Sequence, residues 1–112
     1  MFRKTLTTKE DTAVKKFTKQ LRALFPQEII AIKLFGSKAR GDSHKESDID
    51  LLVLVTKKTE SLENAVIDLV CEILNQSGIF LETVTLPASR YEEARLEQYP
   101  FVMNVERDSI SL

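Results

Sequence analysis

The chain has 112 residues, of which 43% are hydrophobic and 29% are charged, a composition typical of one soluble globular domain. Its 16 basic and 17 acidic side chains give a formal net charge of -1, which argues against a protein that binds extended nucleic acid through phosphates. One cysteine, Cys71, excludes an intramolecular disulfide, and no apolar run approaches the roughly 20 residues that cross a membrane. We expect a cytoplasmic protein with a single domain over residues 1–112.

The first part of the chain predicts a helix and then a strand. Thr7 and Glu10 form a Thr-x-x-Glu capping box, which begins a helix whose apolar residues follow helical spacing until Pro26 ends it. Residues 29–35 are rich in β-branched and aromatic side chains and stop at Gly36, so they predict a mostly buried strand.

The middle of the chain predicts a loop, a strand and a helix. Residues 36–47 are polar, and residues 37–40 within them have the composition of one helical turn. Residues 48–55 predict a second strand with two acids at its entrance. Residues 62–74 carry apolar side chains at i, i+3, i+4 and i+7, the clearest amphipathic helix in the chain, and Gly78 stands where a C-cap glycine belongs.

The last part of the chain predicts a strand and three short elements, so that the main order is helix, strand, strand, helix, strand, helix. This order indicates an α/β (α+β) two-layer fold, with a small mixed β-sheet and helices packed on it. The long connection through the helix at residues 62–74 predicts one crossover between its flanking strands. The late elements are a strand at residues 79–86 closed by Pro87, a capping box from Ser89 to Glu92 beginning a helix near residues 91–98, a short helix at residues 101–105 after Pro100, and an edge strand at residues 109–112.

Asp48 and Asp50 bring two carboxylates to the entrance of the second strand. Side chains two residues apart on a strand project from the same face, within about 7 Å along it. Like charges at that separation repel, and a hard divalent cation such as Mg²⁺ between them removes that cost. Taken alone, an Asp-x-Asp pair is more often a turn cap and a solvated edge residue.

Gly36 and Ser37 follow a buried strand and precede the expected helical turn. Glycine lets the backbone approach a ligand closely, and N–H groups at a helix start attract phosphate. Arg40 suits a bidentate contact with phosphate, although a surface ion pair with Asp42 or Glu46 explains it as well. By itself, the Gly-Ser pair is more simply a strand-to-helix turn. The other basic side chains of this segment are expected in solvent: Lys38, His44 and Lys45.

The order of these features is far more specific than any one of them. From Leu34 to Val55 the chain reads strand, Gly-Ser, an Arg-Gly turn, and then Ser-Asp-Ile-Asp leading a strand, with ten residues between Ser37 and Asp48. This stretch resembles the signature of the DNA polymerase beta nucleotidyltransferase superfamily, and its Gly-Ser-x-Ala-Arg-Gly and Ser-Asp-x-Asp-Leu segments are similar to the minimal nucleotidyltransferase (MNT) group. The predicted order of elements agrees with the two-layer nucleotidyltransferase fold.

The resemblance implies a nucleotide site and a metal site. Gly36 and Ser37 would hold the triphosphate of ATP, with Arg40 beside it. Asp48 and Asp50 would bind magnesium, with two Mg²⁺ ions expected.

A third acid from a later strand completes the site in the family, and Glu82 is the candidate here. It is the only acid in an otherwise apolar and threonine-rich strand, where a charge needs a partner or a metal. The family usually has aspartate at this place, so the longer glutamate leaves full catalytic competence open. An edge position facing water is the alternative for Glu82.

The resemblance also implies an activity and a partner. The chain would transfer a nucleoside monophosphate, AMP from ATP, onto an acceptor. Because it is short, we expect it to act with a partner protein or as a homo-oligomer. MNT proteins are often paired with a HEPN-domain ribonuclease, which they neutralise as antitoxins, in one route by transferring AMP onto a tyrosine of the toxin. The alternative is an inactive module that neutralises the toxin by binding alone. A small-molecule acceptor is disfavoured, because it would need a walled pocket.

Overall fold

The computed structural model describes residues 5–41 and 48–112. Within that part of the chain the predicted order of elements is confirmed, whereas the predictions for His44 and Lys45 lie outside it. None of the helices found there combines the length and the apolar character that a membrane span requires. The elements are α1 (Thr8–Leu24), β1 (Ile29–Phe35), α2 (Ser37–Arg40), β2 (Ile49–Val55), α3 (Glu60–Ser77), β3 (Leu81–Pro87), α4 (Ala88–Leu96), α5 (Pro100–Asp108) and β4 (Ile110–Ser111).

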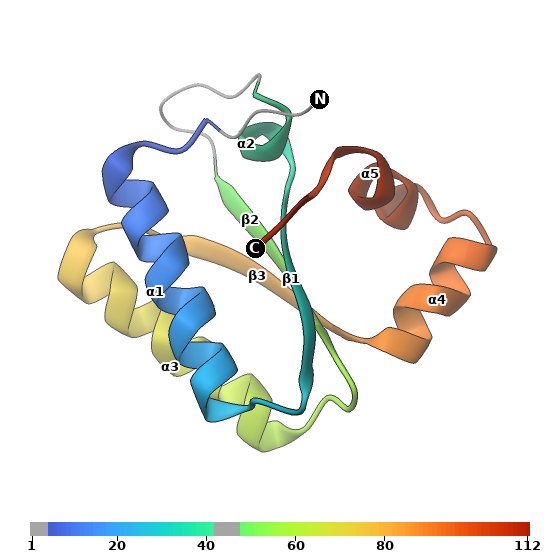
Figure 1. The fold of residues 1–112 in the computed structure, drawn as a ribbon, viewed down its shortest axis with the longest axis horizontal. Helices are drawn as coiled ribbons and strands as arrows, with labels where there is room; N and C mark the ends of the chain where they lie inside the picture. Colours follow the sequence, from blue (N-terminus) through green and yellow to red (C-terminus); the bar gives the residue numbers. More distant parts are fainter. Residues whose placement is uncertain (1–4, 42–47) are drawn as a thin grey trace.

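The strands form one mixed sheet in the order β3-β2-β1-β4 (Figure 1). β1 is antiparallel to both β2 and β4, whereas β2 and β3 are parallel. The connection between β2 and β3 runs through α3, which is the crossover that the sequence predicts. The small mixed sheet of the predicted α/β class is therefore confirmed.

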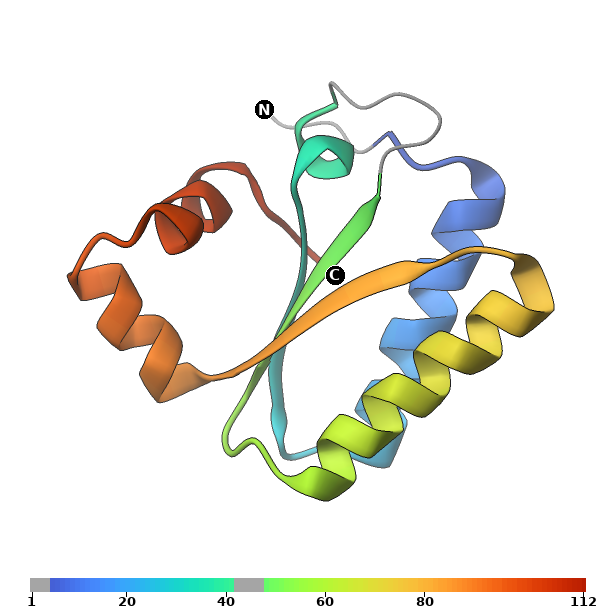
Figure 2. The ribbon, with the colours of Figure 1, turned by 180° about the vertical axis from the view of Figure 1, so that it is seen from behind.

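The larger of two apolar clusters lies between the sheet and the helices α1 and α3. These two helices run side by side over one face of the sheet (Figure 2). Side chains alternate between the faces of a strand, so every second residue of β2 enters this cluster. Its main members are Phe17 and Leu21 of α1, Ile49, Leu51, Val53 and Val55 of β2, and Leu62, Val66, Leu69 and Ile73 of α3.

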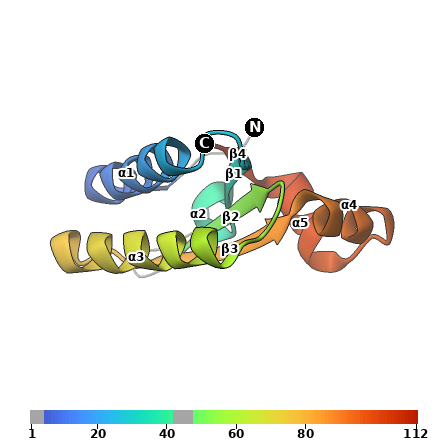
Figure 3. The same cartoon turned by 90° about the horizontal axis from the view of Figure 1, so that it is seen from below.

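A smaller apolar cluster lies on the opposite face of the sheet. Leu52 and Leu54 of β2 pack there against Tyr91 of α4 and against Val102 and Val105 of α5. Seen along the edge of the sheet, α4 and α5 lie on the side away from α1 and α3 (Figure 3). The expectation that Tyr91 covers the sheet is confirmed, and α4 and α5 add a partial second helical cover to the predicted fold.

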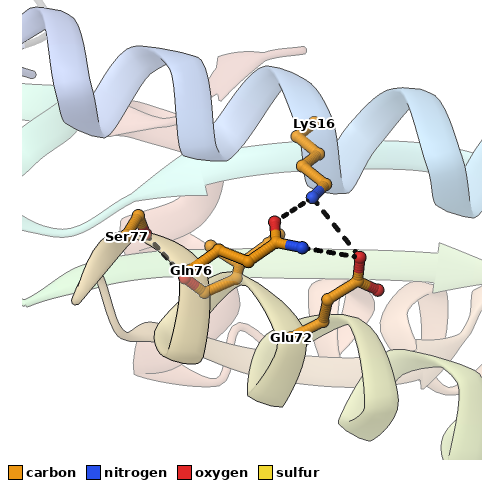
Figure 4. Close-up of polar contacts among 5 residues, drawn as sticks. Lys16, Glu72, Gln76 and Ser77 are labelled. Carbon is orange, nitrogen blue, oxygen red and sulfur yellow. Dashed lines mark hydrogen bonds and ion pairs between the residues drawn. The ribbon is translucent and has the colours of Figure 1, made fainter.

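Polar contacts across the outer surface of α1 and α3 accompany their apolar packing. Lys16 Nζ lies 3.4 Å from Glu72 Oε1 and also donates to Gln76, whose Nε2 donates to Glu72 at 3.3 Å (Figure 4). Ser77 Oγ donates to the Ile73 carbonyl at 2.6 Å and so stays within α3. Because exposed ion pairs contribute only about 0–1 kcal/mol, buried apolar surface supplies most of the attraction between α1 and α3.

Two predicted helix ends are confirmed. Thr7 and Glu10 form the capping box of α1: the Glu10 N–H donates to Thr7 Oγ1 at 3.1 Å, and the Thr7 N–H donates to Glu10 Oε1 at 2.9 Å. At the other end of the helical layer, Gly78 closes α3 in the left-handed conformation, and its N–H donates to the Leu74 carbonyl at 2.8 Å.

The predicted capping box over residues 89–92 is wrong. β3 continues through Pro87, and α4 begins at Ala88 with no side-chain cap, so Ser89 already lies inside the helix. The next proline begins a helix rather than only breaking the chain: Pro100 occupies the first turn of α5, where a missing N–H costs nothing, and the helix extends to Asp108.

Candidate active site

The turn from β1 into α2 lies beside the entrance of β2. Phe35, the last residue of β1, pairs with Asp50 in the antiparallel ladder. Gly36 then takes φ 75° and ψ -161°, a conformation that residues with a Cβ rarely adopt. The chain continues at once into the single turn of α2, where the Gly41 N–H donates to the Ser37 carbonyl at 3.0 Å. The predicted Gly-Ser turn and helical turn are therefore both present.

Gly36 and Asp50 are in close contact. A Cβ placed on Gly36 would overlap Oδ2 of Asp50 and would lie 3.3 Å from its Cγ. The carboxylate therefore rests against the glycine backbone, in space that any larger residue would occupy. Residues 14 positions apart in sequence meet here because Phe35 and Asp50 are ladder partners.

The three acids singled out by the sequence lie at one end of the sheet. The parallel register pairs Asp50 of β2 with Glu82 of β3, so their Cα atoms are about 5 Å apart and their side chains share a face. That face is the one on which Leu52 meets α4 and α5. Asp48 directly precedes β2, and both Asp48 and Glu82 are exposed while Asp50 is half-buried.

The charges of these acids act on one another although the side chains do not converge on a point. Burial, then the negative charges of Glu82 and Asp48, raise the pKa of the Asp50 carboxyl to about 6, against the opposing charge of Arg40. Among residues 5–41 and 48–112, no three His, Cys, Asp or Glu side chains stand close enough together to hold a metal ion. The acids thus form a repulsive group whose side chains would have to turn inward to share a cation.

Arg40 lies at the end of α2 and is paired with α5. Its Nη1 lies 4.0 Å from Oδ2 of Asp108, and its charge also reaches Asp50. The alternative partners considered from the sequence, Asp42 and Glu46, lie outside the described residues. The sequence analysis did not identify Asp108. An acid in the last turn of a helix is unfavourable to the helix dipole, so its presence there could have suggested a neighbouring cationic side chain.

Lys38 is buried, so the expectation that it lies in solvent is wrong. Its side chain is 2% exposed, and Nζ lies 3.3 Å from both carboxylate oxygens of Glu10 on α1. Thr5 adds a second link between these segments, because its N–H donates to the Lys38 carbonyl at 2.9 Å. This ion pair connects the turn that carries Ser37 to the start of α1. No local sequence pattern predicts it.

Replacing Gly36 by alanine is expected to damage the site, because the new methyl group would displace the Asp50 carboxylate and strain the positive φ. Gly78→Ala is a matched control: its φ is also 75°, but nothing lies within 4 Å of the added Cβ. Thermal unfolding should show a loss of about 1 kcal/mol for Gly78→Ala and a clearly larger loss for Gly36→Ala. Equal losses would contradict the contact with Asp50.

Sequence comparison finds similarity to nucleotidyltransferases. A family model described as "Nucleotidyltransferase domain" matches residues 14–105, a span that includes every candidate site residue. A protein of Methanocaldococcus jannaschii named "Putative protein adenylyltransferase" is 36% identical over 75 residues, which are 67% of this chain and 71% of that protein. A second protein of the same organism and name is 43% identical over 42 residues, 38% of this chain and 42% of that protein.

A solved structure supports the fold. The crystal structure of a "putative nucleotidyltransferase" from Sulfolobus solfataricus superposes with a TM-score of 0.56 at 19% identity, covering 89% of this chain and 76% of the other. At that identity the likeness concerns the arrangement of the backbone only. The family match, in contrast, extends over most of the sequence, from α1 to α5. The chain therefore belongs to the nucleotidyltransferase domain family.

Proposed function

We propose that this nucleotidyltransferase transfers AMP from magnesium-bound ATP to a hydroxyl group of a partner protein. The observation that carries the proposal is the arrangement of Gly36, Asp50 and Glu82. Gly36 contacts Asp50, and Asp50 is the strand partner of Glu82, so the strand-to-helix turn lies next to two acids that repel each other. The two relatives from Methanocaldococcus jannaschii are both named "Putative protein adenylyltransferase", and this name favours a protein as the acceptor.

The donor chemistry of the site fits magnesium. Carboxylate oxygens are the ligands that Mg²⁺ prefers; the pKa of Asp50 is raised first by burial and then by the negative charges of Glu82 and Asp48, which a divalent cation would neutralise. Asp48, Asp50 and Glu82 would hold the ions, two in number. Bound there, magnesium would neutralise the triphosphate and stabilise charge on the attacking and leaving oxygens.

The residues of the chain would then bind and orient the reactants. Ser37 and the guanidinium of Arg40 hold the β and γ phosphates, which leaves the α-phosphorus facing the acids. The acceptor oxygen attacks the α-phosphorus as the bond to the pyrophosphate oxygen breaks, and the hydroxyl proton passes to the Glu82 carboxylate. The products are the AMP-modified acceptor and pyrophosphate.

We further propose a HEPN-domain ribonuclease as the partner protein, with the chain as its antitoxin. The support is the similarity of the segment from Gly36 to Asp50 to MNT proteins. A homo-oligomer is the competing arrangement.

A second candidate function is neutralisation of such a partner by contact alone. One observation that favours it is the exposure of Glu82. Another is that, among the described residues, no three His, Cys, Asp or Glu side chains stand in a group able to hold a metal ion. Under this candidate the surface of the chain inhibits the partner, and nucleotide transfer plays no part.

The test incubates the chain with a candidate HEPN protein and ATP labelled on the α-phosphate, with Mg²⁺ or with EDTA. We expect label on the partner only with Mg²⁺, a mass increase of one AMP, and no label with Asp48→Ala. Asp68→Asn is the control, since this acid is exposed on α3, away from the site.

Partner activity measured in the same samples separates the two candidates. Inhibition that survives Asp48→Ala without any label supports neutralisation by contact. Transfer that proceeds equally in EDTA would overturn the magnesium proposal, and adenylation of a sugar in place of a protein would overturn the acceptor.

A further inference from the structure

Asp108 is a buried acid in an electrostatically unfavourable place. It is the last residue of α5 and is 4% exposed. Carbonyl groups give a helix C-terminus partial negative charge, so an acid there is normally destabilising. A buried carboxylate also needs compensation by hydrogen bonds or positive charge. The apolar side of α5, which packs on the sheet, supplies neither hydrogen bonds nor positive charge to this carboxylate.

Two arginines supply that compensation. Arg107 donates to Oδ1 of Asp108 from Nε and to Oδ2 from Nη2, both at 2.9 Å, and Arg40 Nη1 lies 4.0 Å from the same Oδ2. The hydrogen bonds from Arg107, followed by the charges of Arg107 and Arg40, outweigh desolvation and lower the pKa of Asp108. Asp108 is therefore ionised at neutral pH, and its carboxylate interacts with Arg107 of α5 and with Arg40 of α2.

The strand that follows Asp108 lies beside the end of β1 next to the Gly-Ser turn. Ile110 of β4 pairs with Leu34 of β1 in an antiparallel ladder. The chain therefore enters β4 from the end of β1 that is followed by Gly36, and Asp108 lies two residues before Ile110. Figure 1 shows the chain passing from α5 into β4 across the end of β1 that carries α2.

Within the described residues, the charge of Arg40 interacts with two sources of negative charge. One is Asp108, and the other is the acid group around Asp50, on which the charge of Arg40 acts. Loss of the Asp108 charge would leave the attraction of the guanidinium toward Asp50, where a cation is to bind, with less opposition, since opposite charges attract strongly at partly buried positions. Asp108 opposes that attraction.

We propose that Asp108 is a positioning residue for the nucleotide: from α5 it holds the Arg40 guanidinium clear of the acids, in place for the β and γ phosphates of ATP. The inference rests on the proposed function, because it needs a triphosphate in this site. It makes α5 part of the nucleotide site, although α5 supplies no group that touches the reacting atoms.

Calorimetric titration of the whole chain with ATP and with AMP, both in Mg²⁺, tests the proposal. We expect Asp108→Asn to weaken ATP binding about tenfold and AMP binding less than twofold, because AMP lacks the two phosphates assigned to Arg40. Asp68→Asn removes the same charge from an exposed place on α3 and should change neither affinity. A purely structural role for Asp108 would lower both affinities together with the melting temperature.

A double variant tests whether Asp108 acts through Arg40. In an Arg40→Gln background, Asp108→Asn should weaken ATP binding no further, whereas independent roles would make the two losses multiply. If Asp108→Asn does not fold, Asp108→Glu is measured instead: it keeps the negative charge that faces Arg40, so ATP should bind within about threefold of wild type, and a tenfold loss confined to ATP would count against the charge as the cause.

Two outcomes count against the inference and are distinguishable. If the wild-type chain binds no nucleoside triphosphate in Mg²⁺, the proposed function fails and the inference fails with it. If wild type binds ATP and Arg40→Gln weakens binding while Asp108→Asn binds within twofold of wild type, only the inference is overturned.

Discussion

Replacing Asp50 by asparagine is expected to abolish transfer and at the same time to stabilise the metal-free fold. Loss of the central carboxylate removes a proposed magnesium ligand and should lower the rate at least about a thousandfold. The same change removes a half-buried charge whose pKa is raised to about 6 by burial, Glu82 and Asp48. Because solvent screens this group, the gain in stability should be about 1 kcal/mol.

The gain from Asp50→Asn should depend on pH. An unfolded aspartate titrates near 3.8, whereas Asp50 in the fold titrates near 6. Between these values the folded state binds the extra proton, so the stability contributed by this residue rises as pH falls from 7 to 4. Melting temperatures of wild type and Asp50→Asn in EDTA should differ most at pH 7.5 and converge near pH 4. A variant that melts below wild type at pH 7.5 would contradict the repulsion.

Replacing Lys38 by methionine is expected to destabilise the whole domain strongly. The change leaves the Glu10 carboxylate largely buried without the ammonium that lies 3.3 Å from it. Breaking a buried ion pair from one side costs about 3–5 kcal/mol, which for a domain of this size lowers the melting temperature by more than about 10 °C. Thermal unfolding followed by circular dichroism measures this directly.

Two further variants serve as a control and a rescue for Lys38→Met. Lys15 has an exposed side chain that pairs with Asp11 at 2.9 Å, so Lys15→Met should change stability by less than about 0.5 kcal/mol. Adding Glu10→Gln to Lys38→Met removes the orphaned charge but keeps an oxygen for the Thr7 N–H, and should recover much of the loss. If Lys38→Met melts like wild type, the ion pair contributes no net stability.

Much of the architecture follows from local patterns in the sequence. Helical spacing in α3 and the β-branched run in β1 each reflect the face that an element buries, so they predict elements without knowledge of their partners. The capping box at Thr7 was predicted for the same reason, since its hydrogen bonds are local. The supposed capping box at Ser89 failed because the preceding strand extends to Pro87 and changes where the helix starts.

The sequence by itself determined the family, the element order and the identity of the candidate residues, because the Gly-Ser turn and the Asp-x-Asp pair are contiguous motifs. Only the tertiary structure decided which residues from distant segments contact these motifs. Strand register sets Glu82 beside Asp50, burial hides Lys38 against Glu10, and the return of the chain through β4 brings Asp108 to Arg40. These contacts join segments far apart in the sequence, where no local spacing encodes a distance, so they depend on how sheet and helices pack.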